Sequence, residues 1–368
     1  MFRQFLHRFW VRLVEHIDGP LLLIVGALMA AGLATVFSAT FDANNRALSQ
    51  LLNMLVGVCA MWAVAQLPPQ KLMRFAVPLY VLGVILLLLV FFFGVKVNGA
   101  KRWLSLGFTR IQPSEILKIA MPLMLAWYFH KHEALLKFRH YLVAFLLLIV
   151  PFGLIAKQPD LGTAILVGAT GFYVIFFAGL PWKVIVGMVA AAAGAAPFVW
   201  TMLHDYQRKR ILTLIDPTTD PLGAGYHIIQ STIAIGSGGP FGKGWLEGTQ
   251  THLEFIPERH TDFIFAVFSE ERGLLGNAIL VLLYTLLIAR GMMIAANAST
   301  LFARVMAGAI TLSFFTYAFV NMGMVSGILP VVGVPLPFIS YGGTALVTLF
   351  VGLGILMGIQ THRMLVKK

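Results

Sequence analysis

Charged residues are scarce in this sequence. They make up 11% of its 368 residues, and hydrophobic residues make up 59%, whereas a soluble globular domain carries about 25% charged residues. The mean hydropathy of +0.85 is equally unlike that of a soluble domain. Because a helix needs about 20 apolar residues to cross a bilayer, the composition leaves no room for a large soluble domain. It predicts an all-α, polytopic integral membrane protein with about ten transmembrane helices.

Cysteine is almost absent as well. The single Cys59 lies inside an apolar run, so no disulfide can form within the chain and the sequence carries no mark of a redox compartment. The formal net charge of +12 raises the question of a nucleic-acid partner. However, the basic residues are scattered through short joints rather than gathered on one face. We therefore expect no nucleic-acid partner, and anionic lipids of the bilayer or a phosphorylated lipid substrate fit the charge better.

Apolar runs separated by short polar joints fill most of the chain, and we expect a single membrane domain over residues 1–368. Residues 1–20 place aromatic and aliphatic side chains at helical spacing with arginines between them. This pattern is typical of an amphipathic helix at the membrane interface and not of a cleavable signal. The ten predicted spans are residues 21–37, 48–67, 75–95, 116–129, 141–156, 161–180, 184–200, 263–289, 305–325 and 344–359.

The charges of the joints predict that both chain ends face the cytoplasm, N-in and C-in. Cytoplasmic joints would hold Lys71, Lys131 and Arg290, among others, and the C-terminus would add Arg363. The opposite side is also rich in cations, which topology rules disfavour there, so those cations need another reason. That side carries one long extracytoplasmic loop, residues 204–261. Long ordered loops are usually functional, although a plain surface connector remains an alternative.

Two similar motifs open spans that enter from the outer side. Gln-Pro-Ser-Glu at 112–115 and Gln-Pro-Asp at 158–160 each combine an early proline with an acid in the first turn. Because acids favour the positive end of the helix dipole, ordinary helix starts remain an alternative. Lys118 favours a functional site, since it lies on the same face as Glu115 and one turn deeper. A charge at mid-bilayer costs at least about 2.5 kcal/mol, so we expect this pair to face a polar cavity, with a purely structural ion pair as the alternative.

The densest group of polar residues lies at the end of the long loop. Glu258, Arg259, His260 and Asp262 come directly before an apolar run that begins at Phe263. Aspartate is among the best helix N-caps, so a simple cap is one interpretation of Asp262. A cap does not explain the three charged or titratable residues before it, or the Glu-Glu-Arg that follows two turns later. The pattern therefore indicates a site at the mouth of this span.

Several further motifs occur in one order along the chain. They are Lys101-Arg102-Trp103-Leu104, Gln112-Pro113-Ser114-Glu115, Gln158-Pro159-Asp160-Leu161-Gly162-Thr163, Asp216-Pro217, Asp220-Pro221, Gly225-Tyr226, Gln230-Ser231, Glu258-Arg259-His260-Thr261-Asp262-Phe263 and Ser340-Tyr341-Gly342-Gly343. Over essentially its whole length the chain thereby resembles the SEDS family, the proteins of shape, elongation, division and sporulation. The short N-terminus and the glycine-rich residues 236–245 resemble the elongation branch, the rod-shape proteins.

The resemblance implies a peptidoglycan glycosyltransferase that polymerises lipid II into glycan strands during cell elongation. It also implies a class B penicillin-binding protein (a transpeptidase) and the elongation machinery as partners. The implied location is the bacterial cytoplasmic (inner) membrane, with the active site facing the periplasm. Within the site it implies Asp262 as the essential carboxylate, Arg102 in the loop after the third span, and the ion pair of Glu115 and Lys118 near Asp160.

The chemistry of lipid II polymerisation agrees with these residue types. A carboxylate such as Asp262 can act as the general base on an acceptor hydroxyl, with inversion and release of undecaprenyl pyrophosphate. Burial and neighbouring cations shift its pKa in opposite directions, so the net direction stays open. A divalent cation, Mg²⁺ or Mn²⁺, held by carboxylates and substrate could assist the pyrophosphate. The candidates for binding the substrate and its pyrophosphate are Arg102, Glu115, Lys118, Lys157, Asp160, Arg259 and His260.

Two other functions use similar features. A transporter or flippase for lipid II would also need intramembrane ion pairs and a polar cavity. The acids and prolines of this chain gather on the outer side, whereas a carrier needs polar residues at mid-membrane and on both faces. A non-catalytic scaffold for a class B penicillin-binding protein is the third possibility. In a scaffold, replacing Asp262 by alanine would leave polymerisation intact.

Overall fold

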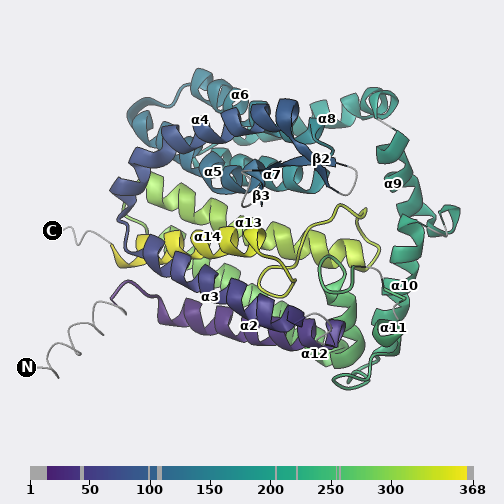
Figure 1. Ribbon diagram of the computed structural model, residues 1–368. Coiled ribbons are helices and arrows are strands. Elements are labelled where there is room, and N and C mark those ends of the chain that lie inside the picture. The colour runs from purple at the N-terminus through teal and green to yellow at the C-terminus, as the bar shows by residue number, and fades with distance from the viewer. Residues whose placement is uncertain are drawn as a thin grey trace, which may run out of the picture.

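The computed structural model describes residues 15–41, 45–97, 100–105, 110–203, 205–220, 223–253, 255–256 and 258–362. Most of the predicted amphipathic helix at residues 1–20, and Arg363 near the C-terminus, lie outside the described residues. Figure 1 shows a bundle of long helices with one small sheet. The elements are α2 (Gly19–Thr40), α3 (Arg46–Ala65), α4 (Pro69–Phe93), β1 (Val95–Val97), β2 (Ala100–Ser105), β3 (Arg110–Ile111), α5 (Pro113–Lys131), η2 (Glu133–Leu135), α6 (Phe138–Lys157), α7 (Leu161–Phe177), α8 (Trp182–Met202), α9 (Asp205–Ile215), η3 (Pro217–Thr219), α10 (Ala224–Ser237), α11 (Thr249–His252), α12 (Ile264–Ala296), α13 (Leu301–Val325) and α14 (Thr344–Thr361).

Each of the ten predicted apolar runs corresponds to one long helix, α2 to α8 and α12 to α14. Among the described residues, seven helices have the length and apolar composition to cross a membrane, namely α2, α3, α4, α6, α12, α13 and α14. Helix α7 and residues Trp182–Phe198 of α8 are shorter apolar segments. The predicted class of polytopic helical membrane protein is confirmed, and the count of ten spans stays a prediction.

Helix α13 lies at the centre of the bundle. It packs against α5 and α7 on one side and against α12 and α14 on the other. Helix α3 packs along α14, and the approach is close enough that a Cβ on Gly57 would lie 2.1 Å from the Phe350 ring. Small residues at helix interfaces are how membrane helices approach one another, because lipid provides no hydrophobic drive for their association.

A small antiparallel sheet, in the order β1-β2-β3, joins α4 to α5. Val95 pairs with Trp103, and Leu104 pairs with Ile111. These short strands were not predicted, because strands of two to six residues give no run long enough to show a period of two. The sheet matters to the site because it places Arg102 of β2 beside Asp160, the N-cap of α7.

The two described ends of the chain lie on one side of the bundle, where the rings of His16 and His362 stack with centroids 4.2 Å apart. This agrees with the predicted placement of both ends on the same side of a membrane. Helices α9, α10 and α11 of the long loop lie at the opposite end of the bundle (Figure 1). Within that loop, the apolar stretch at residues 226–235 forms α10.

Candidate active site

A cavity of about 380 Å³ opens where the first turns of α5 and α7 meet. Its polar lining comes from the joint before α5, from the two helix starts, from the end of the long loop and from the segment before α14. The residues that the argument uses are Arg102, Glu115, Lys118, Asp160, Thr261, Gly333 and Tyr341. Four of the seven predicted binding residues, Arg102, Glu115, Lys118 and Asp160, are therefore brought together in one place.

The two predicted helix-start motifs contact each other across this cavity. The side-chain amide of Gln112 donates to Asp160 Oδ2 at 3.0 Å. Asp160 Oδ1 accepts from the backbone N–H of Thr163 at 3.2 Å and so caps α7. Asp160 thus fills both of the roles considered from the sequence, because it starts a helix and also lines the cavity.

Arg102 reaches the same carboxylate from the sheet. Its Nη1 lies 3.8 Å from Asp160 Oδ1, and its Nη2 donates to the carbonyl oxygen of Pro159. The Arg102 side chain is 34% exposed, and within the described chain its Nε has no hydrogen-bond acceptor. The long ion pair and the partial exposure of the side chain leave this guanidinium able to bind an anion that enters the cavity.

Glu115 and Lys118 form the predicted ion pair, with Lys118 Nζ 2.6 Å from Glu115 Oε1. Both side chains are almost buried, at 8% exposure for the lysine and 11% for the glutamate. The hydroxyl of Thr348 donates to Glu115 Oε2 at 3.2 Å, and Lys118 Nζ lies 5.4 Å from the centroid of the Tyr317 ring. These additional partners hold the buried pair in one geometry. Such pairing is needed because a buried ammonium without a partner would be strongly destabilising.

Asp262 lies at the edge of the cavity. Its carboxylate lies against Gly333 in the cavity lining, since a Cβ on Gly333 would be 3.2 Å from Asp262 Oδ2. The backbone carbonyl of Asp262 accepts from Asn321 Nδ2 at 2.8 Å, which ties this residue to α13. The interpretation of Asp262 as a helix cap was wrong, because the N-cap of α12 is Phe263 and no side chain caps it. In the described part of the chain, the Asp262 carboxylate makes no hydrogen bond or ion pair.

The environment of Asp262 raises its pKa to about 6, first through burial and then through the negative charge of Glu258. The sequence left the direction of this shift open, and the structure shows that burial prevails. The neighbouring cations do not reverse it, because Arg259 is directed elsewhere. A carboxyl with a pKa near neutrality combines deprotonation at physiological pH with useful basicity, as a general base requires.

Arg259 binds backbone carbonyls rather than the cavity. Its Nε donates to Ala39 O at 2.7 Å, and its Nη1 donates to Thr251 O at 3.2 Å. Lys157 is exposed in the last turn of α6 and is not among the residues that line the cavity. The substrate-binding roles predicted for these two cations stay predictions.

His260 lies beside the cavity and contacts a residue that the sequence did not suggest. Arg46 Nη1 is 2.7 Å from His260 Nε2, and the His260 ring meets Tyr341 edge-on at 5.8 Å. Burial, followed by the charge of Arg46, lowers the pKa of His260. A neutral imidazole at this place can accept the Arg46 hydrogen bond and orient the loop, while its predicted contact with substrate stays a prediction.

The Ser-Tyr-Gly-Gly motif at 340–343 supports the catalytic segment. Ser340 Oγ donates to Thr261 O at 2.7 Å, and the backbone N–H of Tyr341 donates to His260 O at 2.8 Å. Gln50 of α3 donates to Ser340 O at 3.1 Å. These contacts join residues about 80 and 290 positions apart, so the sequence marked this motif only through the family resemblance and not through its contacts.

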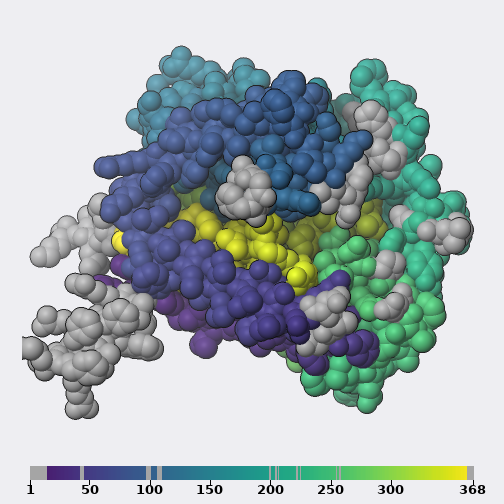
Figure 2. Space-filling model, in the orientation of Figure 1, coloured from purple at the N-terminus to yellow at the C-terminus, as the bar shows by residue number. Residues whose placement is uncertain are grey.

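An apolar groove of about 500 Å³ adjoins the polar cavity and shares Gln112 and Glu115 with it. It runs between α4 and α5 on one side and α3 and α14 on the other, with Leu79, Ile116 and Val347 in its lining. Figure 2 shows this hollow between the blue α4 segment and the indigo α3 segment, with yellow atoms of the C-terminal segment at its floor. The cavity is therefore open sideways to an apolar surface.

Metal binding was predicted only with help from substrate. Among the residues that the structure describes, no three His, Cys, Asp or Glu side chains are placed to hold a metal ion together. Among the described residues of the cavity, Asp160 and Glu115 are each paired with a cation, so the protein could supply few oxygen ligands and would leave the others to a pyrophosphate. This donor set fits a divalent cation shared with substrate, and the cation stays a prediction.

Charged groups gathered at one end of a bundle of membrane helices, next to an apolar groove, are the features of an integral-membrane protein that binds a ligand with an anionic and an apolar part. Comparison with known proteins gives its family. The family model described as a cell cycle protein, FtsW/RodA/SpoVE, matches residues 17–365, and the chain belongs to this family, the SEDS proteins. It is a multi-pass protein of the bacterial inner membrane.

Relatives in this family match the chain over nearly its full length. It is 51% identical over 361 residues to peptidoglycan glycosyltransferase MrdB of Escherichia coli K12, covering 98% of this chain and 97% of that protein. It is 35% identical over 363 residues to the probable peptidoglycan glycosyltransferase FtsW of Geobacter metallireducens, covering 95% and 96%.

Two solved structures share the fold. A chain of a peptidoglycan synthase complex, in which polymerization and crosslinking are coordinated, superposes with a TM-score of 0.81 at 35% identity, covering 93% of this chain and 97% of that chain. The rod shape determining protein RodA of Thermus thermophilus superposes with a TM-score of 0.72 at 30% identity, covering 94% and 97%.

Proposed function

We propose that this protein is a peptidoglycan glycosyltransferase that polymerises lipid II into glycan strands during cell elongation. The greater identity to MrdB, 51% against 35% for FtsW, favours elongation over division. The observation that carries the catalytic assignment is the Asp262 carboxylate, which has a raised pKa, lies at the edge of a cavity with two cations and makes no hydrogen bond or ion pair within the described chain. Spare basicity and nearby positive charge are the two requirements of this transfer.

Asp262 acts as the general base. It takes the proton of the acceptor sugar hydroxyl while that oxygen attacks the anomeric carbon of the donor, and the bond from that carbon to the pyrophosphate breaks. Direct attack inverts the configuration at the anomeric carbon, so Asp262 is never glycosylated. Its proton then passes to the solvent at the cavity mouth, where Glu258 is exposed.

The cations of the cavity stabilise the pyrophosphate that leaves. Each is compensated before substrate binds, Arg102 by Asp160 and Lys118 by Glu115. Arg102 is the better placed to turn toward an anion, because its ion pair is 3.8 Å long whereas that of Lys118 is 2.6 Å long. A divalent cation held by the pyrophosphate and the carboxylates of the cavity would add further charge stabilisation of the leaving group.

The apolar groove beside the cavity accommodates part of the polyprenyl chain of lipid II. It shares Gln112 and Glu115 with the polar cavity, so a lipid tail in the groove would place its pyrophosphate near Arg102. Burying each CH₂ group contributes about 0.8 kcal/mol, which favours apolar tails over free sugars. The groove therefore explains why a lipid-linked substrate would be selected.

The site faces the periplasm, and a class B penicillin-binding protein cross-links the strands made there. The charges of the short joints support this orientation, because it places both chain ends in the cytoplasm. The partner assignment is supported by the synthase complex with the same fold, in which polymerization and crosslinking are coordinated. The elongation machinery would then direct both activities.

The test is polymerisation of labelled lipid II by the purified protein, with and without its class B penicillin-binding protein. We expect glycan strands from the wild type and none from folded Asp262→Ala. Asp216→Ala, which changes an exposed aspartate of the same loop, should keep wild-type activity. Equal strands from Asp262→Ala would refute the assignment of the base. Strands from neither protein would favour a transporter or a scaffold.

A further inference from the structure

Helix α12 is interrupted one third of the way along, and the long loop fills the interruption. Gly273 adopts φ 65° and ψ −162°, so the helical hydrogen bonds cannot continue through it. The loop at residues 239–244 replaces them. It donates two backbone hydrogen bonds to α12 and accepts two from α12. They run from Lys243 N to Glu270 O at 3.0 Å, Gly244 N to Glu271 O at 3.2 Å, Leu274 N to Gly239 O at 2.9 Å and Leu275 N to Pro240 O at 3.0 Å.

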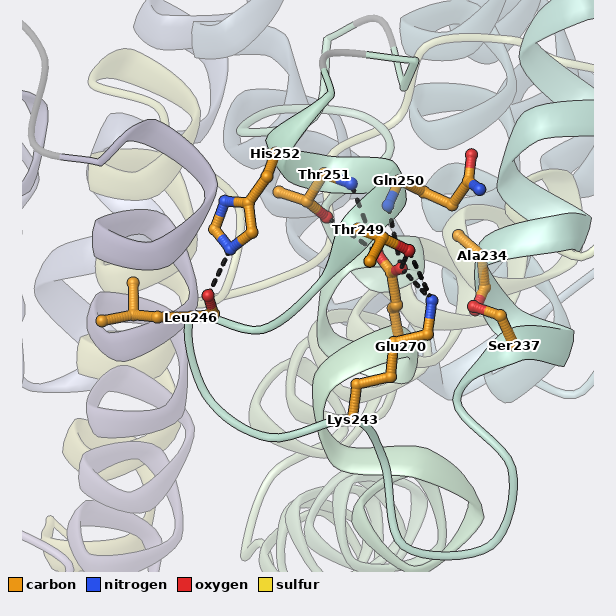
Figure 3. A network of polar contacts seen from close by, with 9 residues as sticks. All are labelled: Ala234, Ser237, Lys243, Leu246, Thr249, Gln250, Thr251, His252 and Glu270. Atoms are coloured by element: carbon orange, nitrogen blue, oxygen red, sulfur yellow. Dashed lines mark hydrogen bonds and ion pairs between the residues drawn. The ribbon is translucent and has the colours of Figure 1, made fainter.

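The Glu270 side chain extends this junction and is fully buried. Figure 3 shows its carboxylate between two parts of the long loop, facing Lys243 on one side and the start of α11 on the other. Lys243 Nζ lies 2.7 Å from Oε1, and the other donors come from three consecutive residues. They are Thr249 Oγ1 at 3.3 Å, Gln250 N at 2.9 Å, Thr251 N at 3.3 Å and Thr251 Oγ1 at 3.1 Å.

The charge and shape of a carboxylate are both needed at this position. Each of the two Glu270 oxygens accepts at least two donors, whereas a glutamine amide would offer one oxygen and place an NH₂ group against other donors. Removing the negative charge would also leave the Lys243 ammonium without its partner, and leaving buried donors unpaired is expensive. The network therefore holds residues 243–251 in one arrangement on α12.

Glu271, the neighbouring residue, ties the same loop to α2. Its carboxylate accepts from the hydroxyl of Ser38 and from the backbone N–H of Leu246, the latter at 3.3 Å. Trp245 Nε1 donates to Ala34 O at 3.2 Å. The loop is thus fixed to the first third of α12, before Gly273, and to α2 together.

A continuous set of contacts leads from Glu270 to the catalytic segment. Thr251 is fully buried and donates its N–H and its hydroxyl to Glu270. Its carbonyl accepts from Arg259, three residues before Asp262. Arg259 also donates to Ala39 O, so the segment that carries Asp262 is held from two sides. Movement of Thr251 would pass through Arg259 to Asp262.

We propose that Glu270 is a positioning residue for the glycosyl transfer. By anchoring residues 243–251 to the interrupted α12, and through Thr251 and Arg259, it holds the Asp262 carboxylate at the edge of the cavity. This inference rests on the proposed function and extends it, because it explains why two glutamates lie inside α12 two turns below the base. Glu270 itself touches no substrate.

The first test compares Glu270→Gln with the wild type, using Glu247→Gln as the matched control on an exposed carboxylate of the same loop. A displacement of about 1 Å can cost about 100-fold in rate, so we expect kcat for lipid II polymerisation to fall about 100-fold with KM within about twofold. Glu270→Asp keeps the carboxylate and should recover part of the loss. Activity of Glu270→Gln within about threefold of the wild type would overturn the proposal.

The pH profile separates positioning from a simple loss of folded protein. If the catalytic segment loosens, Asp262 becomes better hydrated and its pKa falls from about 6, so the acid limb of kcat moves to lower pH in Glu270→Gln. A smaller folded fraction would scale the whole curve and leave the limb in place, and that result would refute the proposal. If Glu270→Gln does not fold, Thr251→Val removes only the hydroxyl donor and should shift the limb in the same direction.

Hydrogen exchange tests the anchor independently of activity. Peptides covering residues 243–253 should be protected in the wild type and in Glu247→Gln, and should exchange at least about tenfold faster in Glu270→Gln. Equal protection in all three proteins would show that Glu270 anchors nothing. If the wild type fails to polymerise lipid II but the exchange result holds, the proposed function fails and the anchor stands. If the wild type polymerises and Glu270→Gln does so equally well, only this inference fails.

Discussion

The carboxylate of Asp262 lies directly over Gly333, where any side chain would meet it. A Cβ at Gly333 would stand 3.2 Å from Asp262 Oδ2, and the φ of +73° at this glycine is one that other residues adopt only with strain. The two residues are 71 positions apart, and the turn at Gly333 comes from the segment between α13 and α14. The proposed base thus fits beside a backbone turn whose glycine leaves room for its carboxylate.

Gly333→Ala should reduce activity by more than its effect on folding. A left-handed φ costs about 1–2 kcal/mol in a residue with a Cβ, and the methyl group would also displace the Asp262 carboxylate. Gly327→Ala is the matched control, because Gly327 has the same φ of +73° but faces only the methyl groups of Ile228 and Thr232. We expect similar loss of thermal stability in both variants and a loss of kcat per folded molecule of at least about tenfold in Gly333→Ala alone. Equal activity in the two would contradict the close contact with the base.

Polymerisation should lose rate as the pH falls below about 6, because Asp262 must be deprotonated to act as a base and its pKa is about 6. Removing the neighbouring charge with Glu258→Gln should lower the pKa of Asp262, so the acid limb should move to lower pH. The measurement is kcat/KM against pH, with Glu247→Gln as a control that leaves the limb unmoved. A limb near pH 4 in the wild type would argue against this environment for the base.

Asp262→Asn should make the protein more stable at neutral pH while abolishing activity. Since burial raises the pKa of Asp262 from 3.8 to about 6, the folded protein binds this proton more tightly than the unfolded chain. The contribution of the protonated carboxyl is present at low pH and is lost as the pH rises through about 6. Above that pH the wild type therefore bears a cost of about 1–3 kcal/mol, which the neutral amide avoids.

Thermal unfolding in detergent at pH 7.5 and at pH 4 checks the stability of Asp262→Asn. The variant should exceed the wild type at the higher pH. The difference should shrink at the lower pH, where Asp262 is protonated in the folded protein and only partly protonated in the unfolded chain. A variant that is less stable than the wild type at pH 7.5 would indicate that the carboxylate has a structural partner.

The ion pair of Glu115 and Lys118 should respond differently to single and double replacement. Glu115→Leu leaves a buried ammonium unpaired and should destabilise the protein by about 3–5 kcal/mol. The double variant Glu115→Leu with Lys118→Met should recover most of that stability, because both charges are gone, but should remain inactive. Recovery of polymerisation in the stable double variant would show that the pair serves the fold alone.

Much of the architecture could be predicted because each helix that crosses a bilayer needs a long apolar run, which can be recognised in the sequence. The ten predicted runs correspond to α2 to α8 and α12 to α14. Lys118 was paired with Glu115 because their spacing puts them on one helical face. The strands around Arg102 were missed, since two to six residues carry too little pattern. The hydrogen bond from Arg259 to Ala39 O, a carbonyl 220 positions away, was not predicted. Helical spacing and capping rules concern neighbouring residues, so they cannot predict a hydrogen-bond partner at that distance.

The sequence by itself determined the class of the protein, its helix positions and the residue types of its site. It could do so because hydrophobic burial in lipid and helical spacing are properties of neighbouring residues. Only the tertiary structure decided the direction of the Asp262 pKa shift, the contact of Asp262 with Gly333, and the insertion of the loop into the interruption of α12 at Gly273. Desolvation and hydrogen bonding at these places depend on segments that packing brings together. Because these segments are far apart in the sequence, no local pattern predicts their contacts.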